Sequence, residues 1–314
     1  MSLTPRNKFI SIVIPVYNEE KNIGYLLRSI QESMLQLEGY TYEIIFVDDG
    51  STDGTFHLLQ AAAAEAANLF YIRLSRNFGH QNALKAGIDL AKGACVLSMD
   101  GDGQHPPSMI PQLVRKWEEG FDVVYTRRLN TADSRRTKKV SSSRFYKILN
   151  RLSDVEVEEG TADFRLLDER VAAVIRRTQE YELFLRGMVK WVGFRQYAIQ
   201  YAAPGRYAGE TKYTLRKMIS LALRGITAFS TKPLYFATYL GLAFALGAVL
   251  YLPYILYSYF TGNAVSGWAS LIATIVFFGG LQLLILGIIG IYIGKTFMQV
   301  KNRPHYLIQE TNLA

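Results

Sequence analysis

The feature that most constrains this chain is a long stretch near its carboxyl end that carries no charged side chain. Between Pro233 and Gly294 there is no Asp, Glu, Lys, Arg or His, and two apolar segments, 233–260 and 266–294, occupy most of this stretch. Each segment exceeds the ~20 residues that a helix needs to cross the hydrocarbon core of a bilayer. The sequence therefore predicts a hairpin of two membrane-spanning helices, preceded by a charged globular domain.

Basic residues flank the predicted hairpin on both sides, whereas the connecting segment 261–267 has no charge. The flanking residues are Lys212, Arg216, Lys217, Arg224 and Lys232 on one side, and Lys295, Lys301 and Arg303 on the other. Because positive flanks mark the cytoplasmic side of a membrane protein, we expect both chain ends in the cytoplasm and the protein in the inner, cytoplasmic membrane. The net charge of +8 is explained by contact with anionic lipid, so we expect no nucleic-acid partner.

The pattern of charge and hydropathy divides the chain into four parts. They are a cytoplasmic domain at 1–211, an amphipathic membrane-interface helix at 212–231, the transmembrane hairpin at 232–295 and a cytoplasmic tail at 296–314. The apolar stripe of the amphipathic segment suits a helix lying in the interface, although a helix packed on the domain would show the same stripe. Small residues such as Gly290 and Gly294 allow close helix packing, either within the hairpin or in a homo-oligomer such as a tetramer.

Strands and helices are predicted to alternate in the charged domain. Short apolar, β-branched runs occur at 9–15, 43–47, 69–74, 94–99 and 122–125, and such runs are typical of buried strands. Helical patterns separate the runs, and Thr52 or Asp53 is expected to cap the helix after the second strand. This alternation predicts an α/β domain with a mainly parallel sheet, whose ligand-binding loops lie at the carboxyl ends of the strands.

The fourth predicted strand runs directly into Asp100-Gly101-Asp102-Gly103-Gln104-His105-Pro106-Pro107. Two carboxylates one residue apart and a nearby amide oxygen are hard ligands, suited to Mg²⁺ or Mn²⁺ with positions left for substrate phosphates. The sequence thus favours a metal–diphosphate site formed by Asp100, Asp102 and Gln104. The alternative is a polar turn, because Asp and Gly are ordinary loop residues.

A basic stretch follows the fifth predicted strand, and it contains Arg127, Arg128, Arg135, Arg136, Lys138, Lys139 and Arg144. Guanidinium groups bind phosphate oxygens well, so we interpret this stretch as a phosphate contact, with a solvated loop as the alternative. No G-x-G-x-x-G follows the first strand and no Walker loop occurs, which favours a metal ion and arginines for holding phosphates. Further along, Asp163 is expected to begin a short strand and Asp168 to cap the next helix.

Taken in order, several motifs resemble those of a known family. They are Ile14-Pro15-Val16-Tyr17-Asn18-Glu19, Val47-Asp48-Asp49-Gly50-Ser51-Thr52-Asp53-Gly54-Thr55, Arg76-Asn77-Phe78-Gly79, the Asp100–Pro107 stretch and Asp163-Phe164-Arg165-Leu166. The set resembles the family 2 glycosyltransferases of GT-A fold, and more narrowly the polyprenyl-phosphate glycosyltransferases related to dolichyl-phosphate mannose synthase. The two carboxyl-terminal spans resemble the bacterial bactoprenol glucosyltransferase subgroup. The family commonly has Asp-Ala-Asp-Leu-Gln where this chain has Gly101 and Gly103, which predicts a more mobile loop.

The resemblance implies a role for each matching residue. Residues of the nucleotide site would be Pro15, Tyr17, Glu19, Val47, Asp48, Asp49 and Asp100. Those of the metal site, for Mg²⁺ or Mn²⁺, would be Asp100, Asp102 and Gln104. Phosphate would be met by Arg127, Arg128 and Arg144 at the donor, and by Arg206 and Lys212 at the lipid. Asp102 and Asp163 would be the catalytic residues, with Asp163 either a base or an orienting group.

The implied activity is transfer of a hexose from a nucleotide sugar to a membrane polyprenyl phosphate. UDP-glucose and undecaprenyl phosphate are the expected substrates, GDP-mannose is the alternative donor, and a single in-line displacement would invert the anomeric carbon. A processive polysaccharide synthase is a rival, but residues 182–187 lack the Gln-x-x-Arg-Trp motif of such enzymes. A non-catalytic membrane subunit that senses nucleotide sugars is a rival from another class, and the intact set of metal ligands argues against it.

Overall fold

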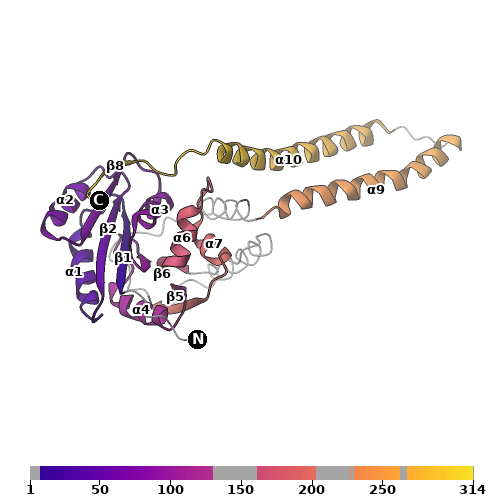
Figure 1. Cartoon of the computed structure of the whole chain (residues 1–314). Coiled ribbons are helices and arrows are strands. Elements are labelled where there is room, and N and C mark those ends of the chain that lie inside the picture. Colours follow the sequence, from indigo (N-terminus) through magenta and orange to yellow (C-terminus); the bar gives the residue numbers. More distant parts are fainter. Residues whose placement is uncertain (1–7, 130–160, 203–226, 228–229, 262–266, 314) are drawn as a thin grey trace.

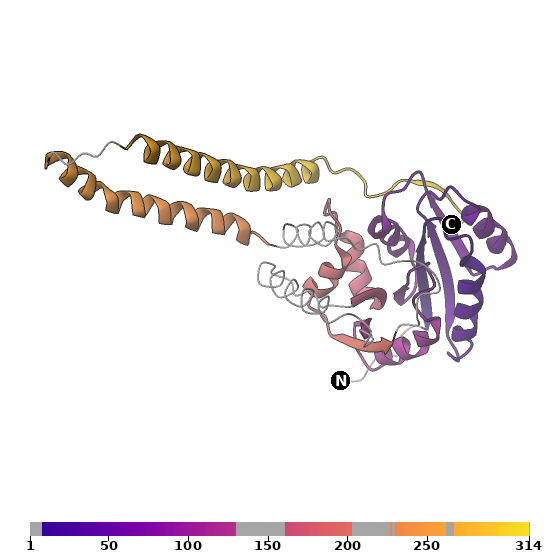
Figure 2. The same cartoon turned by 180° about the vertical axis from the view of Figure 1, so that it is seen from behind.

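The computed structural model of the chain describes residues 8–129, 161–202, 227, 230–261 and 267–313. A domain built around a sheet carries two long helices that extend away from it side by side (Figures 1 and 2). The elements in chain order are β1 (Phe9–Val16), α1 (Ile23–Met34), β2 (Thr41–Asp48), α2 (Thr55–Glu65), β3 (Leu69–Leu74), α3 (His80–Leu90), β4 (Cys95–Ser98), the 3₁₀ turn η1 (Pro107–Met109), α4 (Ile110–Glu118), β5 (Val123–Leu129), β6 (Thr161–Asp168), α6 (Glu169–Arg177), α7 (Leu185–Trp191), β7 (Gln196–Ala202), α9 (Lys232–Phe260), α10 (Trp268–Val300) and β8 (Ile308–Thr311).

Within the described residues, eight strands form one sheet in the order β7-β5-β6-β4-β1-β2-β3-β8. The pairs β1–β2, β2–β3, β1–β4 and β5–β7 are parallel, whereas β6 and β8 run antiparallel to their neighbours. The predicted α/β class with a mainly parallel sheet is therefore confirmed. The carboxyl ends of β1, β2, β3 and β4 meet at one edge, so the polar loops that follow these strands are neighbours.

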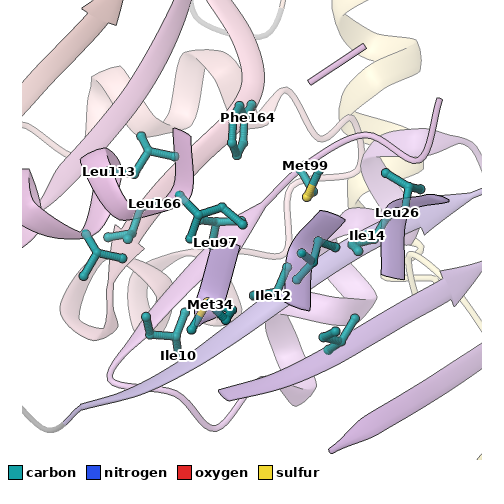
Figure 3. Close-up of a cluster of buried hydrophobic side chains, with 14 of the residues drawn as sticks. Ile10, Ile12, Ile14, Leu26, Met34, Leu97, Met99, Leu113, Phe164 and Leu166 are labelled. Atoms are coloured by element: carbon teal, nitrogen blue, oxygen red, sulfur yellow. The ribbon is translucent and has the colours of Figure 1, made fainter. Parts of the chain in front are cut away.

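Helices cover both faces of the sheet because its central strands are apolar on both sides. Along β1, Ile12 belongs to the core beneath α1, α2 and α4, whereas Val13 belongs to the core beneath α3, α6 and α7. Figure 3 shows the first of these clusters, in which side chains of β1, β4 and β6 meet Leu26 and Met34 of α1 and Leu113 of α4. Continuous apolar runs are needed where a parallel sheet is buried on both faces.

The predicted cap of the second helix is wrong. Helix α2 begins at Thr55 and its N-cap is Gly54, not Thr52 or Asp53. Asp53 still helps the start of the helix, because its Oδ1 accepts a hydrogen bond from the backbone N–H of Thr55 at 3.0 Å. The helix therefore begins later than the polar residues alone indicate.

The predicted start of the strand that carries Asp163 is wrong as well, because this strand begins earlier than predicted. Strand β6 starts at Thr161, which places Asp163 inside the strand. The predicted cap of the following helix is confirmed, because Asp168 is the N-cap of α6 and its Oδ1 accepts from the backbone N–H of Arg170 at 3.1 Å. The other carboxylate oxygen of Asp168 accepts from Trp117 Nε1 at 2.8 Å, so this cap also ties α4 to α6.

Helices α9 and α10 are long and apolar enough to cross a membrane. Their most apolar windows, Lys232–Tyr251 and Ser270–Val300, have mean hydropathies of 1.7 and 2.4 and are 6% and 0% buried, so neither is a core helix of the domain. The two helices touch through aromatic side chains, since the ring of Phe244 lies 5.3 Å from that of Phe278. The predicted interface segment 212–231 lies outside the described residues apart from 227, 230 and 231.

After α10 the chain returns to the sheet. Strand β8 pairs antiparallel with β3, with Thr311 opposite Ile72, and the tail therefore completes one edge of the sheet (Figure 1). This strand begins at Ile308. Just before it, the hydroxyl of Tyr306 donates to Asp89 Oδ2 of α3 at 2.8 Å. The end of the chain is thus part of the folded domain.

We expect Gly87→Ala to destabilise the domain, because helix α3 packs closely on the sheet at this residue. A Cβ at Gly87 would lie 2.2 Å from Val13 Cγ1 and 3.0 Å from Val47 Cγ2. Overpacking a filled core costs about 1–3 kcal/mol, so the unfolding temperature of the purified protein should fall by a few degrees. The matched control is Gly24→Ala in α1, where nothing lies within 4 Å of an added Cβ. Equal unfolding temperatures for Gly87→Ala and the wild type would contradict this packing.

Candidate active site

A cavity of about 390 Å³ lies at the carboxyl edge of the sheet, among the loops that follow β1, β2, β3 and β4. The predicted site residues that line it are Pro15, Tyr17, Glu19, Asp49, Asp100, Asp102 and Asp163. Its wall also includes Asn77, Gly79, His80 and Arg186. Motifs that are far apart in the sequence therefore meet at one site.

Hydrogen bonds between side chains and backbone join the loops after β1 and β2. The N–H of Asn18 donates to Ser51 Oγ at 2.9 Å, and the N–H of Thr52 donates to Asn18 Oδ1 at 2.8 Å. Asn18 has φ 56°, in the left-handed region that Asn tolerates better than most residues. The N–H of Glu19 donates to Thr55 Oγ1 at 2.9 Å, which holds this residue at the cavity wall.

Asp49 joins the β2 loop to the loops on either side of it. Its backbone N–H donates to Val16 O at 2.9 Å, and its two carboxylate oxygens accept from the N–H groups of Phe78 and Gly79 at 2.7 and 2.9 Å. Gly79 has φ 93°, a conformation that favours glycine. Burial raises the pKa of Asp49, and the two N–H donors oppose this rise.

Three residues predicted for the nucleotide and metal sites do not line the cavity. Val47 is fully buried in the core beneath it. Asp48 is also fully buried, and its Oδ1 accepts from the N–H of Ser51 at 3.0 Å, which stabilises the turn after β2. Gln104 folds back on its own loop, where its Nε2 donates to Asp102 Oδ2 at 2.6 Å and its N–H donates to Oδ1 at 3.0 Å.

Two histidines hold Asp100 at the cavity. The backbone N–H of Asp100 donates to His105 Nδ1 at 3.0 Å, so a neutral His105 carries its proton on Nε2, which lies 3.6 Å from Asp100 Oδ2. On the other side, His80 Nε2 lies 3.3 Å from Asp100 Oδ1. The ring of His105 stacks on Phe164 with centroids 5.3 Å apart. Burial raises the pKa of Asp100, and both histidines oppose the rise.

Asp163 is buried and paired with two arginines. Arg165 Nη2 donates to its Oδ1 at 2.6 Å, and Arg186 donates to both oxygens, from Nε at 3.0 Å and from Nη2 at 2.8 Å. His80 Nε2 lies 3.5 Å from Asp163 Oδ2. Burial by itself would raise the pKa of Asp163, but Arg186, His80 and Arg165 outweigh it and hold the pKa well below its usual range. Asp163 is therefore an ionised carboxylate and a weak proton acceptor.

The acidic groups at this site fit a hard divalent cation. His80, Asp100 and Asp163 offer ligand atoms within 4.8 Å of one another, but Asp163 is already bound by two guanidinium groups. Asp100 Oδ1, in contrast, is buried and accepts no hydrogen bond from the described residues, and Asp102 lines the same cavity. A buried carboxylate oxygen that accepts no hydrogen bond is suited to Mg²⁺ or Mn²⁺, so Asp100 and Asp102 would be the better pair of ligands.

The sequence did not indicate His80 or Arg186 as site residues. His80 directly follows the Arg76–Gly79 motif and is the first residue of α3, so the motif was a signal for its position. Arg186 lies in α7, within residues 182–187, whose only noted sequence feature is that they lack the Gln-x-x-Arg-Trp motif. Arg186 reaches the site because β6 presents Asp163 toward α7. No local sequence pattern predicts that these two residues pair.

The predicted phosphate contacts are described only in part. Arg127 and Arg128 are exposed at the carboxyl end of β5, and neither lines the cavity. Arg128 lies in register with Tyr201 of β7. Burial raises the pKa of Tyr201, while Arg128 opposes the rise and Asp100 adds to it. The remaining residues predicted to contact phosphate lie outside the described part of the chain, and they are Arg144, Arg206 and Lys212.

Comparisons with known proteins agree with the motifs. Residues 11–175 match glycosyl transferase family 2. An uncharacterized glycosyltransferase of Bacillus subtilis, YkcC, is 42% identical over 96% of this chain and 93% of its own length. A prophage bactoprenol glucosyl transferase homolog of Escherichia coli is 39% identical over 96% of this chain and 98% of its own. A bactoprenol glucosyl transferase of Shigella phage SfII is 38% identical, with the same coverage of both chains.

The chain therefore belongs to glycosyl transferase family 2, and it is a glycosyltransferase with the α/β GT-A fold. The family match spans β1 to α6 and includes the cavity residues from Pro15 to Asp163. Arg186, the strand β7, the two long helices and the tail lie beyond it, but the full-length relatives share this part as well.

We expect Asp163→Asn to destabilise the protein strongly, because it leaves the guanidinium of Arg165, which is 3% exposed, without a counterion. Removing one partner of a buried ion pair costs about 3–5 kcal/mol. The control is Glu65→Gln at the exposed end of α2, which should leave the unfolding temperature unchanged at every pH.

The effect of Asp163→Asn should also depend on pH. The folded-state pKa of Asp163 lies below its unfolded value of about 3.9. Its stabilising contribution is therefore fully present above the unfolded pKa and is lost as the pH falls through the folded pKa. The difference in unfolding temperature between wild type and Asp163→Asn should be largest near neutral pH and should narrow in acid. A difference that widens in acid would contradict the pairing described above.

Proposed function

We propose that this glycosyltransferase transfers glucose from UDP-glucose to undecaprenyl phosphate and so makes a polyprenyl-phosphate sugar in the inner membrane. The observation that carries the proposal is a cavity built from family 2 motifs in a chain with two apolar helices of membrane-spanning length. Relatives that align over nearly their whole length and are named bactoprenol glucosyl transferase support both the sugar and the lipid acceptor.

The nucleotide would bind along the wall formed by the loops after β1 and β2. Tyr17 is 45% exposed and offers an aromatic face to a base, while Pro15 beside it adds apolar surface. Glu19 and Asp49 would accept hydrogen bonds from the base and ribose. Asp48 would act from beneath, by holding the turn that presents its neighbour Asp49.

Asp100 and Asp102 would hold Mg²⁺ or Mn²⁺, with Gln104 keeping the Asp102 carboxylate in place. When bound, the cation would neutralise charge that develops on the leaving diphosphate. Exposed guanidinium groups of Arg127 and Arg128 would add positive charge at the same edge of the sheet.

The acceptor phosphate is already an anion, so the reaction needs no strong base. One phosphate oxygen attacks the anomeric carbon, the bond from that carbon to the UDP oxygen breaks, and UDP leaves with the bonding electrons. A single displacement of this kind inverts the anomeric configuration. The depressed pKa of Asp163 supports an orienting role, in which its carboxylate holds Arg186 and His80 at the cavity and removes no proton.

The membrane parts would bring the acceptor to the site. We propose that residues 212–231 lie in the headgroup layer, that both chain ends are cytoplasmic, and that Arg206 and Lys212 attract the lipid phosphate. At the end of α10, Lys295 is paired with Glu182 at 2.5 Å, which ties the second span to the catalytic domain. Holding donor and acceptor in one place removes much of the entropic barrier.

The proposal predicts a single-sugar lipid as product. Membranes containing the protein are incubated with undecaprenyl phosphate and a panel of labelled UDP-sugars and GDP-mannose, and lipid is extracted into chloroform. We expect label from UDP-glucose, its loss in excess chelator, and its recovery on adding Mg²⁺ or Mn²⁺. Long polymer, label from GDP-mannose alone, or equal transfer in chelator would each count against the proposal.

In the same assay, Asp102→Asn should lower the transfer rate about 100-fold or more, because charge on the leaving group is no longer neutralised. The variant Glu65→Gln serves as the control for a lost exposed carboxylate and should match the wild type. A wild-type rate for Asp102→Asn would exclude Asp102 from the metal site.

Topology can be checked with single cysteines, because the native Cys95 is fully buried. Thr261→Cys lies at the far end of α9 and should react with a membrane-impermeant maleimide in intact spheroplasts. Gln309→Cys, in the exposed part of β8, should react only after permeabilisation. The reverse pattern would place the catalytic domain on the other side of the membrane.

A further inference from the structure

A second cavity, of about 560 Å³, adjoins the first. The two cavities share Gly79 and His80 in their walls, so they meet at the start of α3. From there the second cavity extends to Met298 in the last turns of α10 and to Arg303 just after that helix. It therefore connects the catalytic cavity with the end of a candidate membrane span, and we call it the acceptor groove.

The acceptor groove carries positive charge that the described protein does not neutralise. Arg76 from the loop after β3 and Arg303 both line it, and neither forms an ion pair with a carboxylate of the described residues. Arg76 lies over the ring of Phe78 at 4.0 Å, which orients its guanidinium without removing its charge. The acidic residue in the wall, Glu182, is already paired with Lys295 at 2.5 Å.

Apolar and aromatic side chains form part of the wall, among them Tyr181, Leu183 and Met298, beside polar ones such as Gln81 and His305. This wall is built from both parts of the molecule. Gln299 Oε1 of α10 accepts from the N–H of Tyr181 at 2.6 Å, and its Nε2 donates to Gln179 O at 2.7 Å. A cationic groove with a partly apolar wall at the end of a candidate membrane span suits an amphiphile with a phosphate head and a hydrocarbon tail.

We propose that this groove is the acceptor subsite, in which Arg76 and Arg303 bind the phosphate of the polyprenyl phosphate. Leu183 and Met298 contact the first part of its hydrocarbon chain, and the phosphate reaches the catalytic cavity past His80. The inference rests on the proposed function and adds to it the route of the acceptor. Arg206 and Lys212 then serve to attract the lipid at the membrane surface, and the groove holds it for the reaction.

The test measures the acceptor and the donor separately. Initial rates of the full-length protein are recorded in phospholipid-free detergent, with undecaprenyl phosphate varied at saturating UDP-glucose and the reverse. Arg76→Gln and Arg303→Gln should each raise KM for undecaprenyl phosphate about tenfold, since each removes one charged donor to the phosphate, and should leave KM for UDP-glucose unchanged. Unfolding temperatures equal to that of the wild type will show that both variants fold.

The matched control is Lys301→Gln. Lys301 is a cation of the same turn as Arg303, but it lies over the ring of Phe297 at 4.3 Å and does not line the groove. Both of its KM values should equal those of the wild type. If Lys301→Gln raises KM for undecaprenyl phosphate as much as Arg303→Gln does, the lipid is attracted by basic residues in general and not by a specific subsite. That result would overturn the proposal.

Two further outcomes would overturn it. If the arginine variants raise KM for UDP-glucose alone, or neither KM, the groove does not bind the acceptor. If they differ from the wild type only after phosphatidylglycerol is added, the groove binds a bilayer phospholipid instead.

Equilibrium binding of undecaprenyl phosphate without donor gives a readout independent of turnover, and the variants should bind it about tenfold more weakly. A wild type that binds this lipid but transfers no sugar to it would refute the proposed function and leave the subsite standing.

Discussion

At the carboxyl edge of the sheet, next to a closely packed core, the backbone N–H and C=O groups of the loops no longer pair with a neighbouring strand. These groups must therefore find other hydrogen-bond partners. Asp49 supplies two of these partners, since its carboxylate accepts from the N–H groups of Phe78 and Gly79. Asn18 supplies another between the loops after β1 and β2. The same short loops carry the side chains of the catalytic cavity. The shape of the site therefore depends on these bonds, and each motif is positioned by the next.

Two neighbouring carboxylates at this edge have opposite environments. Asp163 is saturated by Arg165 and Arg186, and its pKa is held well below the usual range. The pKa of Asp100 is raised by burial, and its Oδ1 accepts no hydrogen bond from the described residues. Environments that push two pKa values apart define two roles. Asp163 is suited to fixing the side chains around it, whereas Asp100 is suited to receiving a cation.

Beyond β7 in the sequence lie the two apolar helices, and after α10 the chain returns to the sheet as β8 (Figures 1 and 2). Its return makes the end of α10 part of the catalytic domain, through Lys295 with Glu182 and Gln299 with Tyr181. These contacts also build the wall of the acceptor groove. The position of the catalytic domain relative to α10 is consequently set by packing and by the pairing of β8 with β3, and not by the short segment 301–307 alone.

The strands, the membrane-length helices and the family could be predicted because their signals are local. Strand 69–74 was predicted at its observed bounds, and the uncharged stretch predicted the two long helices α9 and α10. Different roles of adjacent residues were harder to predict. Asp48 and Asp49 differ in role because successive side chains at the end of β2 point in opposite directions, and the sequence alone assigned both to the nucleotide.

The sequence by itself determined where the chain is apolar, that β2 and β4 run into pairs of carboxylates, and which family those motifs define. These properties follow from the identity and spacing of residues within short segments. Only the tertiary structure decided which charges meet. The pairing of Asp163 with Arg186, and of His80 with both Asp100 and Asp163, depends on how separate elements pack, and no periodicity links those elements in the sequence.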